Sequence, residues 1–107
     1  MKLHEFGNVN APAMILIHGV LTPWQIWLPQ IRAFEKDYHI FAVALSAHTE
    51  EEASEFISLE TEVAEILQEL SRYGVTEIDV LCGLSMGGVI AHEIWKSDRL
   101  PIKHLIL

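Results

Sequence analysis

A serine flanked by glycines occupies the middle of residues 79–95, which read DVLCGLSMGGVIAHEIW. The residues before Gly83 form an apolar run, and those after Ser85 have the spacing of a helix. Where a strand turns sharply into a helix, neighbouring side chains collide, and Gly83 and Gly87 remove them two positions before and after the serine. Such a turn can lift the Ser85 hydroxyl out of the backbone and present it as a nucleophile. The alternative is a tight glycine turn in which the serine only caps the helix.

Two backbone amides are candidates to stabilise a negative charge that develops beside this serine. The helix after Ser85 directs its free N–H groups and the positive end of its dipole toward the turn, and the Met86 N–H is the first of them. A second loop, with the sequence LIHGV, follows an apolar run, and Gly19 allows it to point the Val20 N–H back at the serine. His18, taken alone, is more simply a histidine whose ring is hydrogen-bonded at the end of a strand.

Four continuous apolar runs predict the strands that position these loops. They cover residues 13–19, 38–45, 77–83 and 102–107. Runs that are apolar on both faces are typical of buried parallel strands, because helices cover both sides of such a sheet. Residues 2–7 alternate between apolar and polar side chains and predict an outer strand.

Helical patterns lie between these runs. We expect a short turn near Trp24, and helices over residues 29–36, 58–73 and 86–96. Thr22, Pro23 and Gln25 resemble the capped start of a helix. Pro29 moves the regular helix beyond this turn, because the residue before a proline avoids the helical conformation.

The helix over residues 58–73 has its apolar side chains on one face and its glutamates on the others. The apolar set is Val63, Ile66, Leu67 and Leu70, and the glutamates are Glu60, Glu62, Glu65 and Glu69. Gly74 is expected to end this helix in a left-handed conformation. The alternation of strand and helix predicts a single α/β domain over residues 1–107, with three α/β/α layers and a mostly parallel sheet.

These motifs together resemble the N-terminal half of an α/β-hydrolase fold protein. ILIHGV followed by two tryptophans, then FAVALSAH, then CGLSMGG, come at the ends of three successive predicted strands. The resemblance covers almost the whole chain and implies a partial fold that ends at the strand after the nucleophile helix. It also implies that Ser85 is the nucleophile and that Val20 and Met86 supply the oxyanion-hole amides. Many relatives read D-x-x-G-H-G after the second strand, where only His48 matches here.

The acid and the base histidine of this family come after the nucleophile in the chain, and we expect them beyond Leu107. A serine hydroxyl is a poor nucleophile without a base within hydrogen-bond reach. Within the 107 residues, His48 is the least implausible substitute, because its loop lies at the same end of the strands as Ser85. His92 lies about 10 Å further along the helix axis, at the wrong end.

Other side chains that could do chemistry are more simply explained by packing. Trp24 and Trp27 could line an acyl pocket, although tryptophans at such positions more often belong to the core. Cys82 lies inside a buried strand and is expected to be a small core residue. The histidines without catalytic spacing are His4, His39 and His104. No dinucleotide, phosphate-loop or zinc motif is present, so no cofactor and no metal is expected.

The composition excludes several classes of partner. Half of the 107 residues are hydrophobic and the mean hydropathy is +0.27, so the chain can bury a core. A formal net charge of −8, with seven scattered Lys and Arg residues, argues against binding to nucleic acid or to an acidic membrane surface. One cysteine, no signal-peptide pattern and no membrane-spanning run lead us to expect a cytoplasmic protein.

Two functions remain open for this sequence. In the first, the longer protein is a serine hydrolase that forms an acyl-serine intermediate with a carboxylic ester or a similar small acyl substrate. The 107 residues then supply the nucleophile and the oxyanion hole, and the missing part supplies the acid and the base. In the second, the chain is a catalytically inactive, truncated fragment that binds a partner or self-assembles.

The last strand is the feature expected to drive self-association. It should lie at the edge of the sheet with its apolar side chains uncovered, at Ile102, Leu105, Ile106 and Leu107. Because a hydrophobic edge recruits a partner strand, we expect the 107 residues to pair with, or to exchange segments with, another copy, or else to be one piece of a longer chain.

Overall fold

Strands and helices alternate along the chain in a computed structural model that describes residues 1–46 and 58–107. The strands are β1 (Lys2–Gly7), β2 (Ala13–Ile17), β3 (His39–Ala44), β4 (Ile78–Gly83) and β5 (Ile102–Ile106). The helices are the 3-10 turn η1 (Trp24–Trp27), α1 (Leu28–Phe34), α2 (Leu59–Arg72) and α3 (Met86–Ser97). Each predicted element is present, and its ends lie within two residues of the expected positions.

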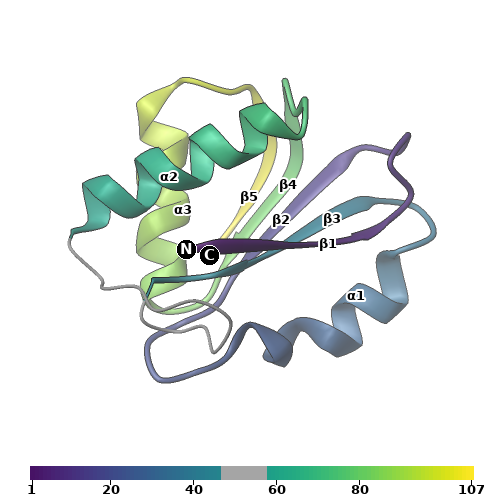
Figure 1. The fold of residues 1–107 in the computed structure, drawn as a ribbon, viewed down its shortest axis with the longest axis horizontal. Helices are drawn as coiled ribbons and strands as arrows, with labels where there is room; N and C mark the ends of the chain where they lie inside the picture. The colour runs from purple at the N-terminus through teal and green to yellow at the C-terminus, as the bar shows by residue number, and fades with distance from the viewer. Residues whose placement is uncertain (47–57) are drawn as a thin grey trace.

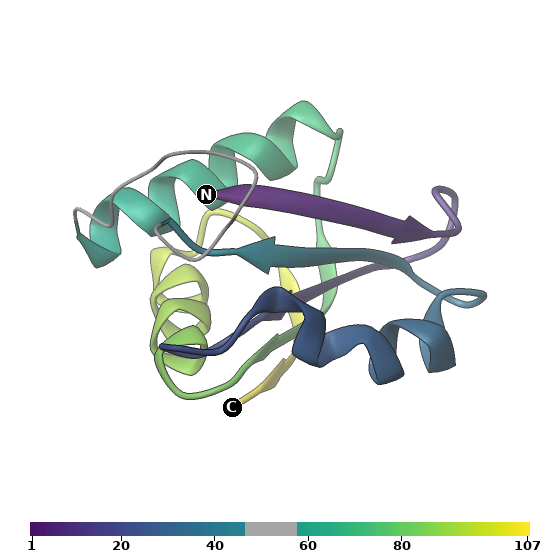
Figure 2. The ribbon, with the colours of Figure 1, turned by 60° about the horizontal axis from the view of Figure 1, so that its bottom comes forward.

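The five strands form one sheet in the order β1-β3-β2-β4-β5. β1 runs antiparallel to β3, whereas the other neighbouring strands are parallel to one another. Helices α2 and α3 lie on one face of the sheet, and η1 and α1 lie on the other (Figures 1 and 2). The predicted fold, three α/β/α layers around a mostly parallel sheet, is therefore confirmed.

β3 lies inside the sheet, and each of its side chains is buried. Phe41 and Val43 belong to the core beneath α2 and α3. Ile40 and Ala42 belong to the core beneath α1, together with Ile31 of that helix. A strand covered on both faces needs apolar residues at successive positions, which explains the continuous apolar run in the sequence.

Helix α2 packs its apolar stripe onto the sheet as predicted, but one glutamate shares that stripe. Ile66 and Leu70 are fully buried, and Glu62, one turn before them, is only 1% exposed. The prediction that Glu62 lies on another face is wrong, because residues spaced by four lie on one side of a helix. The carboxylate is tolerated there because its Oε1 accepts a hydrogen bond from the Ser46 N–H at 2.5 Å. Gly74 follows the helix with a φ of 78°, as expected.

The segment before α1 does not begin with the threonine cap that the sequence predicts. Pro23 is the N-cap residue of η1, and no side chain bonds to the cap. The Thr22 hydroxyl instead bonds to Gly19: it donates to the carbonyl oxygen at 2.8 Å and accepts from the N–H at 3.0 Å. Thr22 therefore closes the loop after β2. In the sequence, the only sign of this hydrogen bonding is that a threonine stands three residues after a glycine.

β5 forms one edge of the sheet, as predicted. Ile106 and Leu107 are 51% and 68% exposed. Ile102 and Leu105 are half-buried and pack against the core beneath α2 and α3, so the prediction that they are uncovered is wrong. Helix α3 packs beside β5 and shields these two side chains from solvent.

Candidate functional site

Ser85 lies in the short turn between β4, which ends at Gly83, and α3, which begins at Met86. Its backbone has a φ of 56° and a ψ of −120°, a combination that residues with a side chain rarely adopt. The side chain is exposed, and its hydroxyl makes no hydrogen bond to the part of the chain that the structure describes. The turn is strained, as the glycine pattern predicts, and the serine side chain does not cap the helix.

Two glycines make this turn sterically possible. A Cβ on Gly83 would lie 2.2 Å from the carbonyl oxygen of Gly87. A Cβ on Gly87 would lie 2.2 Å from the carbonyl oxygen of Ile17, in β2. Both distances are far inside van der Waals contact and involve backbone atoms, which cannot rotate away. The glycines therefore let α3 begin directly against the ends of β4 and β2.

The first turn of α3 provides amides next to the serine. Gly87 and Gly88 donate their N–H groups to the carbonyls of Leu84 and Ser85, each at 2.9 Å. The Met86 N–H donates to no backbone carbonyl of the described residues, because the first amide of a helix has no partner one turn behind it. No acidic side chain lies in the first turn of α3 to neutralise its positive end. A negative charge on a bound molecule would be stabilised at this position.

The loop after β2 runs against the same turn. Gly19 lies so close to Ser85 that an added Cβ would be 3.0 Å from the serine Cβ. The Leu84 N–H bonds to the carbonyl of Ile17, the last residue of β2, at 3.0 Å. Val20 is the next residue along this loop, so the structure brings together the two loops that carry the predicted amides.

His18 has a structural role in this loop. Its side chain is fully buried, and its Nε2 accepts a hydrogen bond from the Leu45 N–H at 3.0 Å. Its Nδ1 lies 2.8 Å from the carbonyl oxygen of Gly19. The ring therefore connects the loop after β2 to the end of β3, which agrees with the simpler interpretation of His18 as a hydrogen-bonded histidine at the end of a strand.

A cavity of about 340 Å³ opens at the serine. The residues that line it are Gly83, Ser85, Gly88, Val89, His92 and Leu107. His92 lies two turns along α3 from Ser85 and on the same side of the helix, so it reaches this cavity although it makes no hydrogen bond to the serine. His48, the other histidine considered as a base, lies outside the described residues.

The two tryptophans of the loop pack on the α1 side of the sheet. The Trp24 ring stacks on His4 of β1, with ring centroids 4.1 Å apart and planes 15° apart. Trp24 and Trp27 both pack against the core beneath α1. Neither lines the cavity at Ser85, so their contacts in the structure are those of core residues.

Other nucleophiles and bases have contacts away from the serine cavity. Cys82 is partly buried against the core beneath α1, and this burial raises the pKa of its thiol. A thiol with a raised pKa is less often ionised at neutral pH and is therefore a weaker nucleophile. His39 bonds to Glu5 of β1, with 2.5 Å between Nε2 and Oε2, and His104 is exposed on β5.

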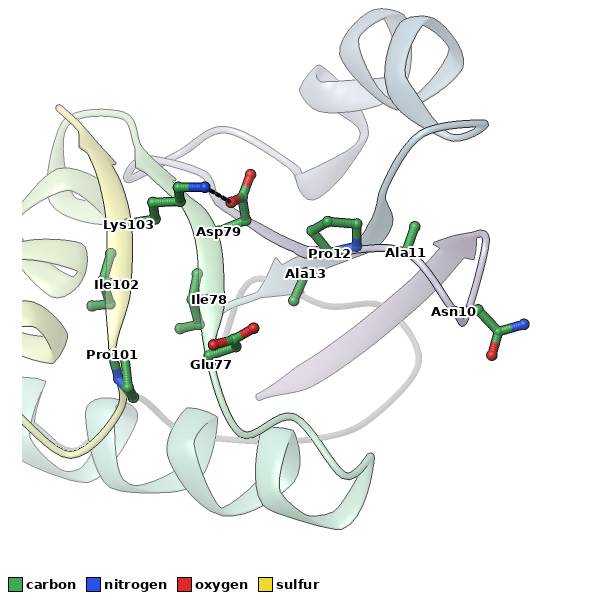
Figure 3. A pocket seen from close by; sticks show the side chains of 10 residues that line it. All are labelled: Asn10, Ala11, Pro12, Ala13, Glu77, Ile78, Asp79, Pro101, Ile102 and Lys103. Carbon is green, nitrogen blue, oxygen red and sulfur yellow. Dashed lines mark ion pairs between the residues drawn. The ribbon is translucent and has the colours of Figure 1, made fainter.

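A larger cavity, of about 710 Å³, lies at the other end of the sheet (Figure 3). Its walls come from the loop before β2 and from the starts of β4 and β5. Figure 3 shows Lys103 of β5 reaching toward Asp79 of β4, with 3.9 Å between Nζ and Oδ1. Ser85 lies at the carboxyl ends of the same strands, where ligands bind in parallel α/β sheets. We therefore place the candidate active site at the smaller cavity.

Residues 1–46 and 58–107 contain no group of three His, Cys, Asp or Glu side chains placed to ligate one metal ion. Within these same ranges, none of the helices combines the length and the apolar character needed to cross a membrane.

Comparisons with known proteins connect the chain to hydrolases, although no protein-family model matches it. It is 33% identical over 88 residues to epoxide hydrolase 4 of Mus musculus, an alignment that covers 79% of this chain and 24% of that protein. A crystal structure of an alpha/beta hydrolase family protein from Desulfitobacterium hafniense matches with a TM-score of 0.92 and 26% identity, over 97% of this chain and 42% of that one. An esterase from a Rhodococcus species matches with a TM-score of 0.80 and 25% identity, over 96% and 39% of the two chains. The chain thus spans about a quarter of the length of the curated relative and about two fifths of the length of the solved ones.

Proposed function

The chain belongs to the α/β-hydrolase superfamily, and we propose that it carries the nucleophile and the oxyanion-binding amides of a serine hydrolase. The observation that supports this function is the conformation of Ser85. An exposed serine with a φ of 56° sits where β4 meets the N-terminal end of α3, beside the loop that holds Gly19. A residue with a strained backbone, whose side chain makes no hydrogen bond that would stabilise the turn, is typical of a catalytic turn.

The proposed reaction begins when the Ser85 Oγ attacks the carbonyl carbon of an ester and gives its proton to a base. The carbonyl oxygen becomes an oxyanion, and the N–H groups of Met86 and Val20 donate hydrogen bonds to it. The intermediate collapses as the carbon–oxygen bond to the alcohol breaks and the alcohol takes up the proton. Water then attacks the acyl carbon and gives a proton to the base, the bond from this carbon to the Ser85 Oγ breaks, and Oγ takes up the proton as the acid is released.

The general base of this reaction is assigned to polypeptide outside the 107 residues. In this superfamily the acid and the histidine follow the nucleophile in the chain. The solved relatives are more than twice as long as this chain, since it covers 42% and 39% of them. The proposed hydrolase is therefore the longer protein, of which these residues hold the nucleophile.

The chemistry of serine favours acyl substrates over the epoxides that the name of the mouse relative indicates. A serine that opened an epoxide would form an ether, which has no carbonyl carbon that water can attack, and the enzyme would stay alkylated. Attack on a carboxylic ester gives an acyl-serine, which water can hydrolyse. We therefore propose carboxylic esters or similar acyl compounds as the substrate class.

A fluorophosphonate probe tests the proposal. The Ser85 oxygen would bond to phosphorus and displace fluoride, and this labelling is expected to disappear in Ser85→Ala. Ser97→Ala, a substitution at the far end of the same helix, is the matched control and should label like the wild type. Labelling of a longer polypeptide but not of these 107 residues would assign the activity to the longer protein. Absence of labelling in both would favour the alternative, a non-catalytic domain that binds or self-assembles.

A further inference from the structure

Hydrogen bonds converge on the backbone of Gly19, beside the serine. The carbonyl oxygen of Gly19 lies 2.8 Å from His18 Nδ1, 2.8 Å from the Thr22 hydroxyl and 3.4 Å from the Thr22 N–H. The Gly19 N–H also donates to the Thr22 hydroxyl, at 3.0 Å. The Thr22 hydroxyl therefore bonds to both polar backbone atoms of Gly19.

The protonation state of His18 follows from its partners. A backbone N–H can only donate, so the bond from Leu45 requires an unprotonated Nε2. The proton of the neutral ring is then on Nδ1, which donates to the carbonyl of Gly19. Because the ring is fully buried and bonded to the residue after β3, it holds the Gly19 carbonyl toward β3.

The order of the strands decides where the next amide points. β2 lies between β3 and β4, and β4 leads to Ser85. In a planar trans peptide the N–H points opposite to the carbonyl of the same peptide group. The Gly19 carbonyl is held on the side of β3 through His18, so the opposite group of this peptide, the Val20 N–H, is expected on the side of β4 and the serine.

The turn that Thr22 closes is itself strained. Leu21 has a φ of 61°, a conformation that favours glycine, and its side chain is 92% exposed. Packing of that side chain cannot hold the conformation. The bonds that Thr22 makes across the turn to Gly19 are then what keeps the loop in this shape.

We propose that Thr22 is a positioning residue for the oxyanion hole, because its hydroxyl fixes the Gly19–Val20 peptide with the Val20 N–H aimed at the Ser85 site. The inference rests on the proposed function, since it assigns a role to the same site. Thr22 does not line the cavity at Ser85, so its proposed role is exerted only through the peptide that it holds.

Phenylboronic acid tests this positioning at equilibrium. The Ser85 oxygen would bond to boron and a proton would pass to water, which gives a tetrahedral boronate anion with one oxygen at the oxyanion position. Thr22→Val is expected to raise the dissociation constant of the boronate about tenfold or more. This is the range for the loss of one well-placed hydrogen bond to a charged group, here the bond from the Val20 N–H. Thr22→Ser keeps the hydroxyl and should stay within about twofold of the wild type. Thr76→Val, at an exposed threonine far from the site, is the control and should bind unchanged.

A second measurement separates this inference from the proposed function. The amide resonance of Val20 in a ¹⁵N–¹H spectrum should move or broaden in Thr22→Val and stay in place in Thr22→Ser, with no probe bound. Failure of the longer wild-type protein to bind the boronate, or equal binding by its Ser85→Ala variant, would overturn the proposed function. An unchanged Val20 amide in Thr22→Val, or unchanged boronate binding, would overturn the role of Thr22. If Thr22→Val does not fold, Thr22→Ala removes the hydroxyl without placing a second methyl group against the loop.

Discussion

Two adjacent glycines at the start of α3 look alike in the sequence, but their surroundings differ. A Cβ on Gly87 would lie 2.2 Å from a backbone oxygen of β2, whereas a Cβ on Gly88 would lie 3.3 Å from the carbonyl oxygen of Gly83. The first contact requires the helix to move away from the sheet. The second can be relieved by a shift of a few tenths of an ångström.

We predict that Gly87→Ala lowers the free energy of unfolding by at least about 3 kcal/mol, the upper end of the usual range for overpacking. Gly88→Ala should change the free energy of unfolding by less than about 1 kcal/mol. The higher helix propensity of alanine, which is worth about that amount, offsets the cost of the small shift. Urea unfolding followed by circular dichroism measures both variants. Equal destabilisation by the two substitutions would contradict the close approach of α3 to β2.

The roles of the site residues differ in how far they could be predicted from the sequence. Ser85 could be predicted because the glycines that its strain requires lie within two residues of it. The bonds of the Thr22 hydroxyl could not, because the same residue type before a proline is also typical of a helix cap. A hydrogen-bonded role for His18 is the simpler interpretation of its sequence, but its partner could not be predicted, because the Leu45 amide lies 27 residues away.

At the scale of elements, helix α2 is connected to the end of β3 by one buried carboxylate. Glu62 Oε1 accepts from the Ser46 N–H, and the Ser46 hydroxyl accepts from the N-terminal ammonium of Met1 at 2.9 Å. Glu62 Oε2 is buried and has no hydrogen-bond partner among the described residues. Removal of the side chain would take this charged acceptor away from the buried Ser46 amide.

We predict that Glu62→Ala lowers the free energy of unfolding by about 1.5–3 kcal/mol, the usual range for a hydrogen bond to a charged group. Glu62→Gln keeps an acceptor oxygen of the same reach and should be less destabilising than Glu62→Ala. Gln68→Ala, at an exposed position of the same helix, should stay within about 0.5 kcal/mol of the wild type. Chemical denaturation of the three variants is the measurement, and a glutamine variant as unstable as the alanine variant would contradict the hydrogen-bonding role.

The elements themselves could be predicted because periodicity depends on residues close together in the chain. The apolar run of β3 predicts a strand whose two faces are both covered, whichever elements cover them. The pattern of α2 predicts a helix with one buried face, whichever element it packs against. The sequence does not state which elements meet. The burial of Glu62 depends on the end of β3, and the burial of Ile102 and Leu105 depends on α3, so both were wrong in the prediction from the sequence.

At the scale of the whole molecule, burial decreases from the middle of the sheet toward β5. The side chains of β3 are all buried, Val80 and Cys82 of β4 are partly buried, and His104 and Ile106 of β5 are exposed. Among the described residues β5 pairs only with β4, so its other edge faces no strand of that part of the chain and lies next to apolar side chains. Such an edge is a template for another strand.

We propose that, in the 107-residue chain by itself, β5 pairs with the β5 strand of a second copy, and we predict that this association increases with salt. The edge strand is apolar, but the chain has a formal net charge of −8, so two copies repel each other at low ionic strength. Raising the salt from about 20 mM to about 500 mM shortens the screening length below about 10 Å and removes most of that repulsion. Light scattering after size exclusion should therefore show a larger dimer fraction at high salt and high protein concentration. Ile106→Lys should reduce it, whereas Val9→Lys, at an exposed residue of the loop after β1, should not, and a wild-type chain that stays monomeric under these conditions would rule out the pairing.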